Sequence, residues 1–360
     1  MVQRGEPALL SKYGRAEIAV KNGVDAVFEL PSAYSNSPAN IFAFSAVSII
    51  QKLSGIDYIC FGSECGDLDL LDFAAEKTLS DGFNSKLRET VKTNKNNSYP
   101  QNLYNLFCEL YGGEKAVVLN GSNNILAIEY IKALKKLKSD IKPMTVKRIG
   151  ADFNSKTTDK TAVSAGYIRK FVRENANGRD LSRPCKDFMP EQAYPIFHEL
   201  IKNGKYTDTD NISPAIISHF NRLDAEEIAG FAEASKSDAY RIKKSLDGCF
   251  DYHSLVKKLE AKHNTSSSVR RMIFNIFFGI TKEMQKNPPD FTILLAFNQK
   301  GGQYLSGIRK KAEINIVTKP ADMKNNLTFD KNLFIDNVCK LALFNKESEI
   351  NAIKEKPFIN

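Results

Sequence analysis

The sequence predicts an α/β fold in three parts, and three observations lead to it. Short apolar strands alternate with helical segments over residues 1–172, the pattern is helical over 187–285, and strands return within 290–360. Alternating strands and helices are typical of a parallel sheet covered by helices. We therefore expect a parallel-sheet domain, then a helical domain, then a small C-terminal α/β unit.

Three strands are predicted in the first part. Residues 24–30 are rich in β-branched and aromatic side chains and are closed by Pro31. Residues 56–61 have the same character and stop at Gly62, and residues 146–149 form the third strand. Their near-continuous apolar character indicates a sheet that is buried on both faces.

Helices are predicted between and after these strands. Residues 40–53 and 123–138 carry apolar side chains at helical spacing, and lysines occupy another face of the second segment. Ser164 is a suitable N-cap for a short helix that continues to Val172.

The rest of the chain is predicted in the same way. Helical periodicity over the middle part covers 191–202, 224–235, 237–246, 252–263 and 266–279. The C-terminal unit has strands at 291–297 and 314–318, with a basic helix at 301–311 between them.

Composition narrows the class of protein. Hydrophobic residues make up 42% and charged residues 26%, as in ordinary globular proteins. No stretch approaches the roughly 18 to 20 apolar residues of a membrane-spanning helix, and the N-terminus does not resemble a signal peptide. We therefore expect a cytoplasmic protein with no membrane partner.

The cysteines predict no metal site. Cys60 and Cys65 are the only close pair among the six, and no second pair completes a zinc site. We expect free thiols.

The charge points toward a polyanionic partner. The formal net charge is +9, which favours nucleic acid but fits a generic basic protein equally well. Charge alone leaves both interpretations open.

Three motifs lie where strands end, and ligands of open parallel sheets bind beyond the carboxyl ends of the strands. The first is 61–66, Phe-Gly-Ser-Glu-Cys-Gly. Its small residues, Gly62 among them, let backbone N–H groups approach a phosphate or ribose. The alternative is a simple turn after a strand.

The second motif, 121–126, opens the helix predicted at 123–138. In the purely structural interpretation, Ser122 or Asn123 is the N-cap of this helix and has no further role. Alternatively, the Asn123 amide could bind an adenine edge or a ribose, since it offers both a donor and an acceptor.

The third motif joins Arg148, at a strand end, to residues 163–169 at a helix start. Free helix N–H groups together with Arg148 and Arg169 would form a phosphate clamp around Ser164. A capped helix beside a surface arginine is the alternative.

The order and context of these motifs resemble the tRNA(Met) cytidine acetate ligase family. The resemblance is dense before residue 172 and thin after 190. It begins with the specific string Val-Gln-Arg-Gly-Glu-Pro-Ala at 2–8. It continues at Lys12, Arg15, 22–25, 29–31, 42–43, 61–66, 123–130, 147–151, 164–165 and 168–169, and more faintly at 267–272 and 295–298.

The resemblance implies a Rossmann-like, nucleotidyltransferase-like parallel sheet and an ATP-dependent ligase. Such an enzyme uses ATP, with magnesium, to activate acetate as acetyl-adenylate. It then acetylates the wobble cytidine of elongator methionine tRNA. By matching positions, Gly62, Asn123 and Arg148 should contact ATP, and Ser164 and Arg169 should lie toward its phosphates.

The resemblance also implies a strand and an Asn-Pro-Phe-His-x-Gly-His motif before the string at 2–8. All four histidines lie instead in the predicted helical part, at His198, His219, His253 and His263. We therefore expect a chain that is truncated at its N-terminus, lacks the first strand and this loop, and is impaired in activity. A true loss of the chemistry is the alternative, and the catalytic residues stay unassigned. Two smaller departures are Ala127 in place of Gly, and Gly121-Ser122 where Pro is usual.

The predicted tRNA-binding surface is the helical domain. Its candidates are Lys257, Lys258, Arg270 and Arg271, and Arg270-Arg271 is the pair that the resemblance reaches. Phosphates would be bound by these cations. A solvated helix face is the alternative for any one lysine.

Three functions remain open at this point. The chain could be the RNA-acetylating ligase, a small-molecule nucleotidyltransferase, or a non-catalytic RNA-binding protein. About 190 residues after the sheet domain argue against the second, and the missing histidine pair favours the third. A requirement for tRNA, and the formation of AMP, would discriminate between them.

Overall fold

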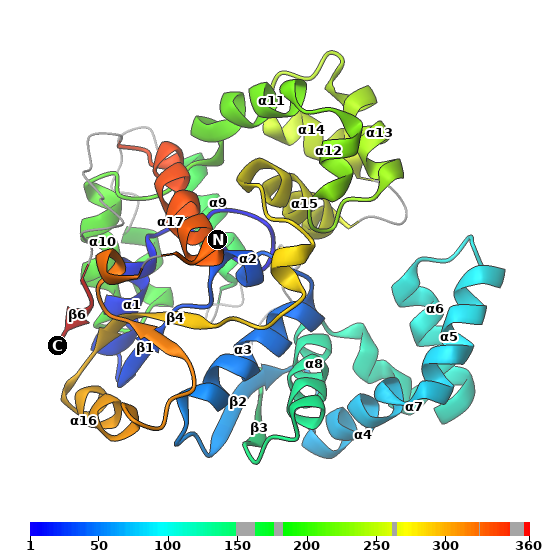
Figure 1. The fold of residues 1–360 in the computed structure, drawn as a ribbon, viewed down its shortest axis with the longest axis horizontal. Coiled ribbons are helices and arrows are strands. Elements are labelled where there is room, and N and C mark those ends of the chain that lie inside the picture. Colours follow the sequence, from blue (N-terminus) through cyan, green and yellow to red (C-terminus); the bar gives the residue numbers. More distant parts are fainter. Residues whose placement is uncertain (149–162, 176–182, 261–264, 324, 346–355) are drawn as a thin grey trace.

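Two small β-sheets organise the chain in the computed structural model, which describes residues 1–148, 163–175, 183–260, 265–323, 325–345 and 356–360. β2 (Tyr58–Ser63) and β3 (Lys142–Lys147) form a parallel pair. β4 (Phe291–Phe297) lies between β1 (Ala26–Phe28) and β5 (Asn315–Val317), and β6 (Phe358–Ile359) also pairs with β4 (Figure 1).

The pairing of β1 corrects the sequence prediction of one parallel sheet in the first part. β1 runs antiparallel to β4, from the opposite end of the chain. The Glu29 N–H donates to the Ile293 carbonyl at 2.9 Å, and the Thr292 hydroxyl donates to the Glu29 carbonyl at 2.8 Å. Local patterning predicted the strand, but pairing depends on which strand edge lies beside it, and that is a tertiary property. The parallel arrangement of β2 and β3 is confirmed.

The predicted helices around β2 and β3 are present. They are α3 (Ala39–Leu53), α8 (Ser122–Leu137) and α9 (Ala165–Glu174). β3 begins at Lys142, earlier than predicted, and includes Pro143 opposite Ile59. A proline is tolerated here because a two-stranded sheet has edges on which no N–H is needed. Residues 149–162 lie outside the described part of the chain.

Several helices were not placed by the sequence analysis. They are α1 (Lys12–Lys21), α2 (Ser32–Ser35), α4 (Leu68–Leu79), α5 (Asp81–Thr93), α6 (Tyr99–Tyr111), α7 (Gly113–Ala116), α11 (Ser213–Arg222) and α17 (Leu327–Cys339). Short 3-10 helices occur at Val117–Asn120, Arg183–Phe188, Thr209–Ile212, Glu283–Gln285, Pro320–Asp322 and Lys340–Ala342.

The helices between β2 and α8 pack around aromatic side chains. Phe107 contacts Tyr111 with ring centroids 4.8 Å apart and Phe83 with centroids 5.9 Å apart. Asp67, Ser80 and Ser98 cap α4, α5 and α6 with their side chains, so the start of each helix was encoded locally.

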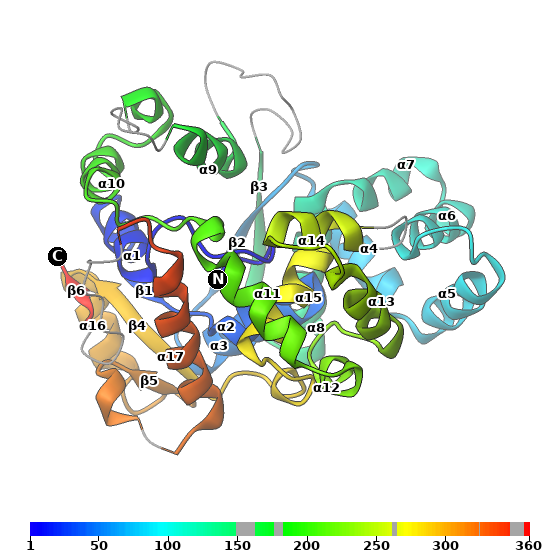
Figure 2. The ribbon, with the colours of Figure 1, turned by 90° about the horizontal axis from the view of Figure 1, so that it is seen from above.

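Most of the helical part packs around one core. It is formed by α11 with α12 (Ala225–Gly230), α13 (Lys236–Leu246), α14 (Tyr252–Leu259) and α15 (Ser266–Phe278), and Phe220, Phe274 and Phe278 are fully buried in it. α10 (Ala193–Lys202) does not join this core and packs against α1 instead. Figure 2 shows α11 to α15 grouped together, with α9 and α10 on the other side of the N-terminal segment.

α12 is shorter than predicted. It ends at Gly230, whereas periodicity had extended it to 235. Phe231 forms a bridge with Thr281, and the Ala232 N–H donates to the Ile280 carbonyl at 2.9 Å. Because residues 231 and 232 pair with residues 280 and 281, they do not continue the helix.

The C-terminal part adds α16 (Gln299–Ile308) between β4 and β5, as predicted. α17 packs against α2 and α15. No helix in the described part of the chain combines the length and the apolar character needed to cross a membrane.

Candidate functional site

The carboxyl ends of β2 and β3 meet the start of α8, and Glu64 joins them. Glu64 Oε1 accepts hydrogen bonds from the Asn123 backbone N at 3.0 Å and from Asn123 Nδ2 at 2.7 Å. Glu64 Oε2 accepts from the Asn124 N–H at 2.7 Å. A carboxylate from the strand-end loop therefore binds the free N–H groups at the positive end of the helix.

This arrangement corrects the predicted N-cap of α8. The N-cap residue is Gly121, not Ser122 or Asn123, and its role is steric. A Cβ at Gly121 would collide with the Glu64 carboxylate. The cap comes from a residue about 60 positions away, which no local pattern could indicate.

The Asn124 side chain also binds the loop that follows β2. Its Oδ1 accepts from the backbone N–H groups of Glu64 at 2.9 Å and Cys65 at 3.2 Å, and the residue is buried. Ser63 Oγ lies 2.7 Å from Thr145 Oγ1 on β3 and accepts from the Gly66 N–H at 3.0 Å. The loop predicted to approach a nucleotide is thus tied to both α8 and β3.

The hydrogen bonds keep Glu64 ionised. Burial alone would raise the pKa of its carboxyl, but the donors on Asn123 and Asn124 outweigh it and lower the pKa below its ordinary value. The Asn123 amide, predicted to face ATP, donates to this carboxylate.

Gly62 and Arg148 lie side by side at the same strand ends. The Arg148 N–H donates to the Ser63 carbonyl at 2.9 Å. A Cβ at Gly62 would lie 3.3 Å from Arg148 Cγ, so the arginine side chain passes over the bare face of the glycine. The structure therefore places Gly62 and Arg148 side by side, both exposed, and Glu64, two residues after Gly62, ties Asn123 to the same strand end.

Ser164 and Arg169 belong to a second cluster, on α9. Ser164 Oγ accepts from the Tyr167 N–H at 3.1 Å, which confirms it as the N-cap. The Glu6 carboxylate forms ion pairs with Arg169 Nε at 3.6 Å and with Arg173 Nη2 at 3.1 Å. Arg169 and Arg173 are four residues apart and so share one face of the helix.

Arg4 connects the two clusters. Burial lowers its pKa, and so do the charges of Arg169, Arg270 and Arg148, whereas Glu6 acts in the opposite direction. Positive charge from both clusters and from α15 therefore converges on this half-buried side chain.

The four predicted RNA contacts divide into two groups. Arg271 makes two 2.8 Å hydrogen bonds to the Glu233 carboxylate, and Lys258 donates to the Ser245 and Asp247 carbonyls. Partners within the helical part engage these two cations, although the Lys258 side chain is exposed. Arg270 and Lys257 instead line a hollow of about 220 Å³.

Arg270 also lines a second hollow, of about 350 Å³, beside α9. Glu6, Arg173 and Arg270 border both hollows. We call the two together the arginine groove, which is defined by Arg4, Glu6, Arg169, Arg173, Lys257 and Arg270. Arg4, Glu6 and Arg173 were not predicted as site residues from the sequence, although the first two lie in the string at 2–8 that carries the resemblance.

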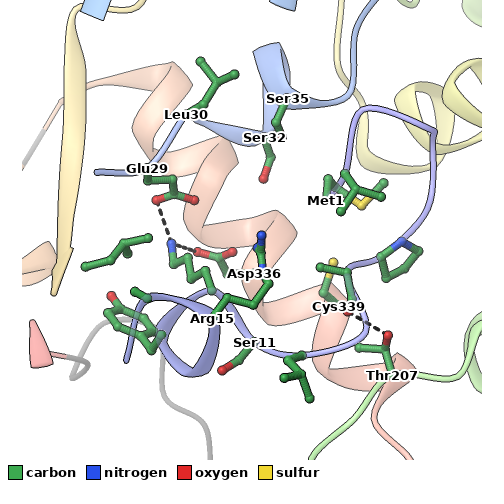
Figure 3. A pocket seen from close by; sticks show the side chains of 18 of the residues that line it. Met1, Ser11, Arg15, Glu29, Leu30, Ser32, Ser35, Thr207, Asp336 and Cys339 are labelled. Carbon is green, nitrogen blue, oxygen red and sulfur yellow. Dashed lines mark hydrogen bonds and ion pairs between the residues drawn. The ribbon is translucent and has the colours of Figure 1, made fainter. Parts of the chain in front are cut away.

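A cavity of about 550 Å³ lies between α1, β1 and α17 (Figure 3). Lys12 Nζ sits in its wall, 2.8 Å from Glu29 Oε2 and 2.6 Å from Asp336 Oδ2. Burial works to lower the pKa of Lys12, but the two carboxylates outweigh it and raise the pKa. Lys12 and Glu29, both in the resemblance, thus form a buried ion triad with Asp336.

None of the histidines in the described part of the chain belongs to the strand-end cluster around Glu64. His198 lies on α10 and His219 on α11. His253 on α14 lines the 220 Å³ hollow and pairs with Asp210 at 3.0 Å. His263 falls outside the described residues. The catalytic residues therefore remain unassigned.

Comparison with known proteins places the whole chain in one family. A model of the HIGH Nucleotidyl Transferase family matches residues 1–354. The tRNA(Met) cytidine acetate ligase of Clostridium perfringens (strain ATCC 13124) is 33% identical over 367 residues, which cover 98% of this chain and 87% of the relative. The ligase of the same name from Clostridium botulinum (strain Kyoto) is 35% identical, covering 91% of this chain and 81% of the relative.

Solved structures agree. The crystal structure of TmcAL from Thermotoga maritima in its apo form superposes with a TM-score of 0.91 at 27% identity, covering 100% of this chain and 90% of that one. The form bound with alpha-thio ATP superposes with a TM-score of 0.88, also at 27% identity and with the same coverage of both chains.

These matches do not support the expected truncation. The family model spans residues 1–354. The chain covers 87% of the Clostridium perfringens ligase and 81% of the Clostridium botulinum ligase. The expectation had rested on the strand and the His-x-Gly-His motif that the resemblance places before the string at 2–8.

Proposed function

The chain belongs to the HIGH nucleotidyltransferase family, among the tRNA(Met) cytidine acetate ligases, and we propose that it is an ATP-dependent ligase that acetylates the wobble cytidine of elongator methionine tRNA. The proposal joins this membership to the place of Gly62 and Arg148, side by side at the ends of β2 and β3, with Asn123 tied to the same loop through Glu64. That arrangement is the observation that carries it.

The proposed reaction has two steps. An acetate oxygen attacks the α-phosphorus of ATP, the bond to the β-phosphate oxygen breaks, and pyrophosphate leaves acetyl-AMP behind. The exocyclic amine of cytidine then attacks the acetyl carbonyl, loses a proton and releases AMP. Both steps build negative charge on oxygen, so they require hydrogen-bond donors and cations more than a protein nucleophile.

The strand-end cluster fits the nucleotide in this reaction. Exposed Gly62 lets a ligand approach the backbone, and the Arg148 guanidinium beside it can bind phosphate oxygens in a bidentate way. The Asn123 amide nitrogen donates a hydrogen bond to Glu64, and this bond holds the Asn123 side chain in a defined orientation. Ser164 and Arg169 are proposed to serve the phosphate end, with magnesium accompanying ATP.

The helical part, 187–285, is proposed as the tRNA-binding domain, between the domain at 1–172 and the C-terminal unit at 290–360. Arg270 and Lys257 are its favoured contacts because they line a hollow. Arg271 and Lys258 are weaker candidates, since contacts within the protein already engage them.

A non-catalytic RNA-binding protein is the second candidate. The observation in its favour is that none of the four histidines of the sequence forms a His-x-Gly-His pair.

The deciding experiment supplies α-labelled ATP, acetate and methionine tRNA to the purified chain. Acetyl-AMP formed without tRNA, and acetylated tRNA formed with it, would support the ligase. Acetyl-AMP with no dependence of turnover on tRNA would indicate a small-molecule nucleotidyltransferase. Tight tRNA binding without AMP formation would indicate the second candidate.

A matched pair of variants ties activity to the proposed site. Arg148→Gln should lower ATP affinity about tenfold or more, because a hydrogen bond to a charged group contributes roughly 1.5–3 kcal/mol. Arg88→Gln, on exposed α5, is the control and should leave ATP affinity unchanged.

A further inference from the structure

The arginine groove gathers charged side chains from four segments of the chain. Arg4 and Glu6 come from the N-terminal segment, Arg169 and Arg173 from α9, Lys257 from α14 and Arg270 from α15. Gly5 makes the approach possible. Its φ is +79°, and a Cβ there would collide with the backbone of Arg270 and Arg271.

Positive charge exceeds negative charge around the groove. Among the described residues, six cations and three carboxylates line its two hollows. One carboxylate, Glu174, pairs with exposed Lys170 at 3.5 Å. Glu6, buried between Arg169 and Arg173, is the carboxylate that holds the arginines together.

Two buried polar atoms on the groove's wall lack a hydrogen-bond partner among the described residues. They are Arg173 Nε and the Tyr252 hydroxyl, and both residues line the smaller hollow. Buried donors without acceptors are costly to a fold. A ligand that brings acceptor oxygens would satisfy them.

We propose that Arg4, Arg173, Lys257 and Arg270 of the arginine groove bind phosphodiester groups of the RNA substrate, while Arg169 serves the ATP phosphates as proposed above. This inference rests on the proposed function. Guanidinium groups bind phosphate oxygens through paired hydrogen bonds. The groove extends over two hollows, from α9 to Lys257 on α14, which suits successive phosphates of a strand better than one nucleotide.

The test measures the affinity of methionine tRNA for the full chain by fluorescence anisotropy at several salt concentrations. Arg173→Gln and Arg270→Gln should each weaken binding about fivefold to tenfold and reduce the slope of log affinity against log salt by about one. Arg173→Lys keeps the charge and should recover part of the loss. Arg88→Gln, on α5 far from α9 in both views, is the matched control (Figure 1, Figure 2).

Each outcome decides. Unchanged affinity and salt slope in Arg173→Gln and Arg270→Gln, or an equal loss in Arg88→Gln, would overturn the inference. Weaker ATP binding with unchanged tRNA binding would assign the groove to the triphosphate and overturn it too. Failure of the wild-type chain to form acetyl-AMP would refute the proposed ligase activity, while the tRNA affinities would still report on the groove.

Discussion

Glu64 and Asn124 hold each other by two reciprocal hydrogen bonds. The Asn124 N–H donates to Glu64 Oε2 at 2.7 Å, and the Glu64 N–H donates to Asn124 Oδ1 at 2.9 Å. One residue follows β2 and the other opens α8, so this pair fixes the strand-end loop against the helix.

Breaking this pair should destabilise the fold. Asn124→Ala leaves the Glu64 and Cys65 N–H groups without their acceptor, and we expect a loss of about 1–3 kcal/mol in the free energy of unfolding. Urea unfolding measures it. Asn84→Ala, whose side chain donates to two carbonyls on a more exposed surface, is the comparison and should cost less. Equal losses would mean that the reciprocal pair has no special role.

Glu64 should also make stability depend on pH. Although burial opposes it, hydrogen bonding lowers the pKa of Glu64 from its ordinary 4.5, so its contribution is full above about that pH. The contribution is lost as pH falls through the lowered pKa of the folded state. Unfolding of the wild type and Glu64→Gln between pH 3 and about pH 7 should therefore converge at the acidic end. A constant gap across this range would contradict the prediction.

The buried triad at the 550 Å³ cavity gives a larger effect. Lys12→Met leaves Glu29 and Asp336 facing each other without a cation, and should cost about 3–5 kcal/mol in unfolding free energy. Lys286→Met removes an exposed partner of Glu283 and should cost less than about 1 kcal/mol. Chemical denaturation of both variants checks the difference.

Gly5 should resist substitution more than a glycine in open space. Gly5→Ala places a Cβ against the Arg270–Arg271 backbone at a φ of +79° and should destabilise by more than about 1 kcal/mol. Gly82→Ala, within α5 and with no neighbour near the added Cβ, should stabilise by about 0.5–1 kcal/mol. Thermal melts of the two variants should move in opposite directions, and a shared direction would refute the steric argument.

Local patterns predicted some single elements accurately, although α1, α4 to α6, α11 and α17 were not placed. Helical periodicity located α3 and α8 to within about a residue of their ends, and Ser164 was identified as a cap because capping is a contact between near neighbours. Gly62 and Arg148 were expected together because parallel strands end at one edge of a sheet, and β2 and β3 do so.

The sequence by itself thus determined part of the elements, the family resemblance and the strand-end position of Gly62 and Arg148. Only the tertiary structure decided that β1 pairs with β4, that Glu64 caps α8, and that Arg4, Arg173 and Arg270 line one groove. Each of these is a contact between segments that are far apart in the chain. Periodicity, caps and turns report on near neighbours, whereas these contacts depend on how complete elements pack.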